Sequence, residues 1–144
     1  MTIDATQYFG KPHSDEQQAD ALELLSRVNP LLDEAALAGA YAHETDLDTG
    51  CEISGAKGGD GDGGFRTPLS RTGVPSSSHR EAKAVDVHDP EDKLDSWLSS
   101  FEGENGANSK LEQYGLYRES PSATPSWVHL TTRAPGSGRR TFNP

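Results

Sequence analysis

Two short apolar segments, far apart in the chain, each carry one side chain that can bind a metal ion. Residues 84–87 read Ala-Val-Asp-Val, and their alternation would place the two valines on one face of a strand and Asp86 on the other. A carboxylate on a strand face needs a partner or a function, because burying a charge is costly. Residues 127–130 read Trp-Val-His-Leu and have the same form, with His129 in place of the aspartate. These segments predict two strands that each present one ligand.

His79 precedes Asp86 by seven residues and would supply a third ligand from the loop before the first strand. Catalytic zinc sites use three protein ligands and leave a fourth position for water, and two histidines with an aspartate suit zinc or another borderline divalent ion. The spacing alone also fits a surface His79, an Asp86 that caps a turn, and a half-buried His129. His88 is the nearest competitor, and on alternation it shares the face of Asp86 and would support the site.

Length and composition favour one domain over residues 1–144, with an arm at 1–13 and a tail at 133–144. Only 32% of the residues are hydrophobic, so we expect a modest core and long loops. No apolar run approaches the roughly 18 residues that a membrane span needs. The formal net charge of −10 argues against nucleic acid as the partner. A single cysteine, Cys51, excludes an internal disulfide.

The remaining patterns predict helices followed by short strands around a further helix. Ser14 is a good N-cap for an amphipathic helix, which Pro30 should interrupt before a second helix over residues 31–38. Leu94, Trp97, Leu98 and Phe101 mark a helix capped near Asp89, and a short helix over 110–114 should end at Gly115. Strands are expected at 51–54, 116–119 and 127–132. The order indicates an α+β domain with a small, mostly antiparallel sheet and N-terminal helices packed on it.

The segment 57–64 is rich in glycine and favours a flexible loop that would suit an active-site flap. Asp60 and Asp62 stand at alternate positions, as in a calcium-binding loop, but the full spacing and the bidentate acid of such a loop are missing. Arg66 follows this segment and is either a surface charge or, beside a metal site, a group that polarises a substrate carbonyl.

The stretch Ser77-x-His79-x-x-Ala82-x-Ala84-x-Asp86 resembles the Ser-x-His-x-x-Gly-x-Ala-x-Asp motif of the D-alanyl-D-alanine carboxypeptidase clan. This clan includes peptidoglycan D,D-carboxypeptidases, vancomycin-resistance D,D-dipeptidases and phage endolysins that cut between L-alanine and D-glutamate. Residues 127–129 resemble its second motif, and residues 64–68 resemble its Gly-Tyr-Arg-Ser-Pro segment. Small phage-encoded members are the most similar. Residues 27–32 resemble the helix with which these members begin, and residues 135–144 resemble their C-terminal tail.

The resemblance implies a D,D-peptidase or hedgehog type of fold with Zn²⁺ bound by His79, Asp86 and His129. It implies that Ser77 and Arg66 bind the substrate and that Arg66 also acts in catalysis on the scissile carbonyl. Several members place a glutamate three residues before the second histidine, where this chain has Ser126. Others place it at the end of the preceding strand, which makes Glu119 the candidate base. Ala82 stands where the motif has glycine.

The implied function is a zinc-dependent metallopeptidase, a peptidoglycan hydrolase of the carboxypeptidase or endolysin type that cleaves the peptide stem. The implied source is a bacteriophage or prophage. The protein would then be made in the host cytoplasm and act at the cell wall or as part of the virion, where other virion proteins would be partners. The substitutions at Ser126 and Ala82 leave open a zinc-binding structural or wall-binding virion component without turnover.

Overall fold

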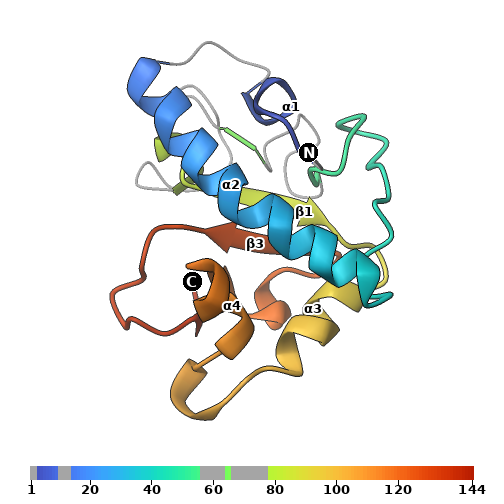
Figure 1. Ribbon diagram of the computed structural model, residues 1–144, viewed down its shortest axis with the longest axis vertical. Coiled ribbons are helices and arrows are strands. Elements are labelled where there is room, and N and C mark those ends of the chain that lie inside the picture. Colours follow the sequence, from blue (N-terminus) through green and yellow to red (C-terminus); the bar gives the residue numbers. More distant parts are fainter. Residues whose placement is uncertain (1–2, 10–13, 56–63, 66–77) are drawn as a thin grey trace.

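A computed structural model describes residues 3–9, 14–55, 64–65 and 78–144 (Figure 1). Its helices are α1 (Ala5–Phe9), α2 (Asp15–Leu37), α3 (Lys93–Ser99) and α4 (Ser109–Tyr114). Its strands are β1 (Ala84–His88), β2 (Tyr117–Glu119), β3 (Trp127–Thr131) and β4 (Thr141–Phe142). Three short 3₁₀ turns lie at Ser78–Glu81, Glu104–Gly106 and Pro121–Ala123.

The strands form one mixed sheet in the order β1-β3-β2-β4. β3 pairs antiparallel with both β1 and β2, whereas β4 pairs parallel with β2. The α+β class predicted from the sequence is confirmed. Within the tail predicted at 133–144, the structure forms a two-residue edge strand, β4. The segment 51–54 contributes only isolated bridges at Cys51 and Ile53, not a strand.

Helix α2 begins as the sequence predicts. The Ser14 side chain accepts a hydrogen bond from the backbone N–H of Gln17, and the Gln17 side chain accepts one from the N–H of Ser14. This reciprocal capping box satisfies two of the N–H groups that a helix start leaves without partners.

The predicted break at Pro30 is wrong, because α2 continues through it to Leu37. Proline removes one backbone hydrogen bond, but Pro30 lies on the solvent face, where water can bind the carbonyl that it leaves free. Leu24, Leu25 and Val28 before the proline, and Leu31 and Leu32 after it, are all buried in one hydrophobic cluster. Packing of this apolar face therefore holds one helix across the proline.

In Figure 1, α2 lies across β1 and β3, so the core fills the space between this helix and the sheet. Val85, Val87, Val128 and Leu130 supply the sheet's contribution to the core. The N-terminal segment packs onto the same body, since the Tyr8 hydroxyl donates a hydrogen bond to the Ala84 carbonyl at 2.8 Å. In the described part of the chain, no helix has the length and apolar character that crossing a membrane requires.

Two predicted helix boundaries are confirmed. Both carboxylate oxygens of Asp89 accept backbone N–H groups of α3, from Leu94 at 3.1 Å and Asp95 at 3.0 Å. Helix α4 ends at Gly115, whose φ of 67° is a left-handed conformation that glycine adopts without strain.

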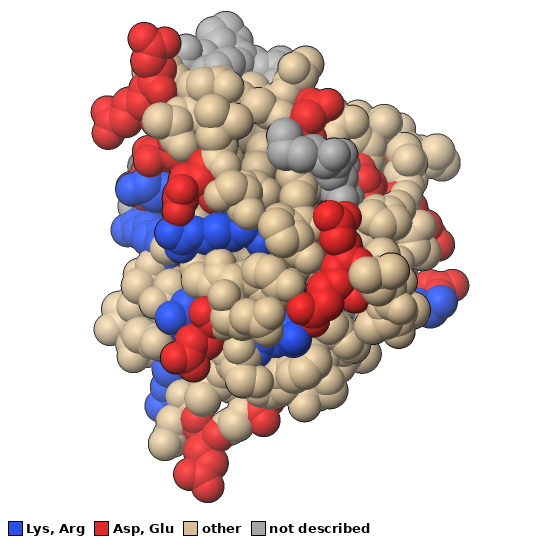
Figure 2. All heavy atoms as spheres, viewed as in Figure 1, with Lys and Arg blue, Asp and Glu red and all other residues tan. Residues whose placement is uncertain are grey.

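On the face shown in Figure 2, acidic side chains are scattered from end to end beside a smaller number of basic ones.

Candidate metal centre

The strand register brings Asp86 and His129 together. Asp86 on β1 pairs directly with His129 on β3, so their side chains leave the same face of the sheet. The β2–β3 register pairs Arg118 with Leu130, and its next step places Glu119 beside His129. The β2–β4 register then pairs Glu119 with Phe142. One row of side chains thus crosses four strands on the face opposite the valines, as the alternation predicts.

His79 joins this row from the 3₁₀ turn that precedes β1. Its Nε2 lies 3.3 Å from Asp86 Oδ1 and 3.2 Å from His129 Nδ1. His129 Nδ1 lies 2.9 Å from Asp86 Oδ1. All three side chains are buried, with exposed fractions of 2%, 6% and 7% for His79, Asp86 and His129. The three residues that the sequence predicts as ligands therefore converge.

The spacing of these three atoms fits a tetrahedral ion. Ligand atoms at 2.0–2.1 Å from a tetrahedral zinc ion lie roughly 3.3–3.4 Å from one another. The observed separations are 2.9, 3.2 and 3.3 Å. Two imidazole nitrogens and one carboxylate oxygen are also the donor set of catalytic zinc sites. The chemistry and the spacing of these side chains thus fit a zinc ion.

A backbone contact fixes the orientation of His79. Its Nδ1 lies 2.8 Å from the carbonyl oxygen of Gly64, which turns Nε2 toward the other two ligands. Such a second contact sets the tautomer and ring angle of a metal-binding histidine. Gly64 can hold this place only without a side chain, because a Cβ there would lie 2.4 Å from the Tyr8 carbonyl oxygen. Gly64 was noted in the sequence only as part of a motif, so its role was missed.

Asp86 is ionised in this site. Burial by itself would raise the pKa of its carboxyl group. The charge of His79 and the hydrogen bond from His129 outweigh burial and hold the pKa of Asp86 well below its usual value. The carboxylate is therefore in the form that binds a cation at neutral pH.

Two residues near the site have left-handed backbone conformations that favour glycine. Ala82 has φ of 58° and Ser126 has φ of 72°. For a residue with a Cβ, this region costs roughly 1–2 kcal/mol. Ala82 stands at the position where the motif has glycine. The backbone there is left-handed, and glycine adopts that conformation with the least strain.

Glu119 lies at the edge of the site. Its Oε1 is 4.0 Å from His129 Nε2, which is the other ring nitrogen from the Nδ1 that lies beside His79 and Asp86, and its side chain is 20% exposed. On β4, the ring of Phe142 stands edge-on to His129, with 6.5 Å between the ring centroids. His88, the competitor for the site, lies apart from the three ligands with its Nδ1 3.4 Å from Asp46 Oδ2. Arg66, Ser77, Asp60 and Asp62 lie outside the described residues.

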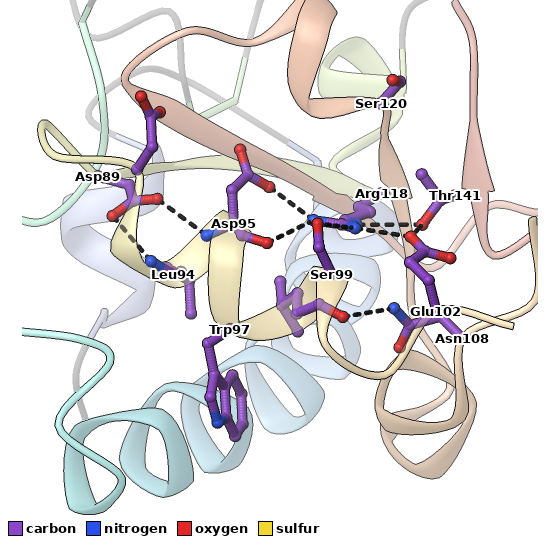
Figure 3. Close-up of polar contacts among 12 residues, drawn as sticks. Asp89, Leu94, Asp95, Trp97, Ser99, Glu102, Asn108, Arg118, Ser120 and Thr141 are labelled. Atoms are coloured by element: carbon purple, nitrogen blue, oxygen red, sulfur yellow. Dashed lines mark hydrogen bonds and ion pairs between the residues drawn. The ribbon is translucent and has the colours of Figure 1, made fainter.

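A buried ion-pair network, which no sequence pattern predicted, lies on the opposite face of β2 (Figure 3). Arg118 is fully buried and lies between two carboxylates, with Nη1 2.8 Å from Asp95 Oδ1 and Nη2 2.6 Å from Glu102 Oε1. Its Nη2 and Nε also donate to the hydroxyls of Ser99 and Thr141. The network ties α3, β2 and β4 together directly behind Glu119. An arginine inside a predicted strand was the only signal in the sequence.

Comparisons with family models, with curated proteins and with solved structures gave no significant match.

Proposed function

We propose that this protein is a zinc-dependent peptidase that cleaves the peptide stem of peptidoglycan. The convergence of His79, Asp86 and His129 within 3.3 Å of one another supports this function more than any other observation. Glu119 beside the site and the left-handed Ala82 at the glycine position of the motif add to it.

His79, Asp86 and His129 would hold the zinc ion, which would supply Lewis-acid chemistry by lowering the pKa of a water molecule and polarising a carbonyl group. The protein must add a base, and Glu119 is the described carboxylate next to the ligands that is not itself one of them. Its Oε1 would take a proton from the attacking water and later deliver it to the amine that leaves. The partial exposure of Glu119 gives water and substrate access to this carboxylate.

Arg66 and Ser77 have substrate-binding roles in this proposal. A guanidinium group near the scissile bond would stabilise the negative charge that develops on the carbonyl oxygen. The Ser77 hydroxyl would hold a peptide or carboxylate group of the stem. Both roles rest on the motif alone. In a phage setting, the wall is the site of action, and the enzyme would work in lysis or as a virion part.

The metal is tested first, by elemental analysis of purified protein after dialysis. We expect close to one zinc per wild-type chain and far less in His129→Ala. His43→Ala is the matched control, because His43 is an exposed histidine outside the site, bonded to Glu52. Equal zinc in His129→Ala and wild type would remove the proposed centre.

Activity is tested with zinc-loaded protein and purified peptidoglycan, by measuring new amino groups. We expect release by wild type and by Glu112→Gln, an exposed-glutamate control, and a loss of about 10²–10⁴-fold in Glu119→Gln. Zinc content should be unchanged in Glu119→Gln, which separates loss of the base from loss of the metal. Release that survives in Glu119→Gln would exclude this residue as the base.

A second candidate function is a zinc-binding structural or wall-binding virion component on the same site. The observation that favours it is Ser126, which stands where several members of the resembling clan have a glutamate and cannot act as a base at neutral pH. Stoichiometric zinc without any release of amino groups, together with co-sedimentation of the protein with peptidoglycan, would favour this candidate over the enzyme.

A further inference from the structure

Three carboxylates meet at the turn between β1 and α3, away from the zinc-type site. Asp89, Asp92 and Asp95 each offer an oxygen, and these oxygens all lie within 4.8 Å of one another. Two ligands on opposite sides of a calcium ion are at most roughly 4.6–5.2 Å apart, because each lies 2.3–2.6 Å from the ion. The cluster is thus compact enough for its members to share one ion.

The Asp95 side chain provides a second and independent observation. It is 4% exposed, and its Oδ2 is buried without a hydrogen-bond partner. Figure 3 shows this oxygen pointing away from Arg118, which binds the other oxygen of the same carboxylate. A buried carboxylate oxygen with no partner is costly and calls for an unseen ligand. Thr124, in the loop that faces this turn across a pocket, has the same feature at its hydroxyl.

The local charge is also out of balance. The single guanidinium of Arg118 pairs with two carboxylates, those of Asp95 and Glu102. Asp89 and Asp92 place two more carboxylates beside Asp95. Lys93 is close by, but it is exposed and paired with Glu91 at 3.0 Å. Burial and the neighbouring Asp89 raise the pKa of Asp95 to about 7, against the attraction of Arg118. Burial raises the pKa of Asp89 as well.

We propose that Asp89, Asp92 and Asp95 bind a hard divalent cation of the calcium type, distinct from the zinc-type centre. The three proposed ligand atoms are all carboxylate oxygens. Calcium is bound by oxygen ligands, whereas nitrogen and sulfur ligands suit zinc. Asp92 and Asp95 line the pocket together with Pro121, Ser122 and Pro125, so water has room to complete the coordination. Asp89 can take part although both of its oxygens already accept N–H groups, since each carboxylate has about four lone-pair sites.

The ion would fasten the turn to the start of β3. Asp89 donates its N–H to the Ser126 carbonyl at 3.0 Å, and Asp92 Oδ1 accepts the Ser126 N–H at 3.1 Å. Ser126 directly precedes β3, which carries His129, and Asp89 follows β1, which carries Asp86. Occupancy would therefore brace the two strands that present the zinc-type ligands. The inference does not depend on the peptidase proposal.

The test is isothermal titration of Ca²⁺ into the full-length protein, freed of other ions by dialysis and given one equivalent of zinc. The test variant is Asp92→Asn, because Asp92 is exposed and has φ of 57°, a conformation that asparagine tolerates. The matched control is the double variant Asp60→Asn/Asp62→Asn, which removes the other calcium-like pattern of the sequence. Circular dichroism of each variant checks folding, and Asp95→Asn replaces Asp92→Asn if the latter does not fold.

We expect one calcium per wild-type chain, unchanged binding in the double variant, and affinity at least about tenfold weaker in Asp92→Asn, since calcium affinity follows the charge of its ligands. Calcium should also raise the unfolding temperature of wild type more than that of Asp92→Asn. No calcium binding by wild type would overturn the proposal. Binding that is lost in the double variant but kept in Asp92→Asn would equally overturn it.

Discussion

Replacing Arg118 by methionine should strongly destabilise the protein, because it breaks the buried ion-pair network on the sheet face opposite the candidate metal centre. Arg118 is fully buried and donates five hydrogen bonds, two of them to Asp95, two to Ser99 and Glu102, and one to Thr141. Methionine fills a similar volume but leaves both carboxylates without their cation. Glu102 is 27% exposed and can turn to water, whereas Asp95, at 4%, cannot.

The magnitude follows from that difference in exposure. Breaking a buried ion pair by removing one partner costs about 3–5 kcal/mol, because the remaining carboxylate either stays buried without compensation or must take up a proton. Asp95→Asn in the same chain removes that charge, so Arg118→Met/Asp95→Asn should recover about 2 kcal/mol relative to Arg118→Met. Arg118→Lys keeps the charge but loses the fork that reaches several acceptors, so its stability should fall between those of Arg118→Met and wild type.

Urea unfolding, followed by tryptophan fluorescence, measures these free energies for wild type, Arg118→Met, Asp95→Asn, Arg118→Met/Asp95→Asn and Arg118→Lys. The double-mutant cycle isolates the coupling between Arg118 and Asp95. A loss below about 1 kcal/mol in Arg118→Met, or no recovery when Asp95→Asn is added, would refute the view that this network holds α3 and β4 onto β2.

Three further changes test other parts of the structure. Gly64→Ala should weaken zinc binding in elemental analysis, because its Cβ would meet the Tyr8 carbonyl at 2.4 Å and displace the contact that orients His79. Pro30→Ala should raise the free energy of unfolding by up to about 3 kcal/mol in urea, since it restores a helical N–H at an exposed position; a lower stability would contradict this. Asp95 has a folded-state pKa of about 7, above its unfolded value of 3.8, so its ionisation costs stability as the pH rises from about 4 to 7. In cation-free buffer, wild type should lose up to about 1.4 kcal/mol per pH unit relative to Asp95→Asn over that range, and parallel stability curves would contradict the assignment.

The sequence predicts well that the three candidate ligands come together, because strand alternation is a local and reliable signal. Asp86 and His129 each sit within a short apolar run whose period of two fixes the face of the sheet. The row that they form with Glu119 then follows from antiparallel pairing of neighbouring strands. The helix caps at Ser14 and Gly115 are local in the same sense, since each depends on residues within one turn.

The features that the sequence does not predict depend on contacts between distant residues. Pro30 reads as a helix end because local propensity disfavours it, and only the burial of both flanking apolar segments overrides that preference. The edge strand at 141–142 pairs through backbone hydrogen bonds with β2, 23 positions earlier in the chain, and the Arg118 side chain also reaches the Thr141 hydroxyl. The contact between Gly64 and His79 spans 15 positions in the chain. The group that contacts His79 is a backbone carbonyl, which every residue has, so the residue type does not predict the contact.

Arg118 and Glu119 are neighbours on β2 that face opposite sides of the sheet, and this arrangement ties the buried network to the candidate metal centre. A slip of β2 by one residue would exchange the two side chains. Glu119 would then lie among Asp95 and Glu102, where like charges repel, and the guanidinium would lie against His129. That alternative is costly on both faces, so the ion pairs of Arg118 specify the register that delivers Glu119 to within 4.0 Å of His129 Nε2. Under the proposed peptidase function, the Arg118→Met variant should therefore lose activity through misplacement of Glu119 even under conditions where it remains folded and keeps the zinc content of wild type.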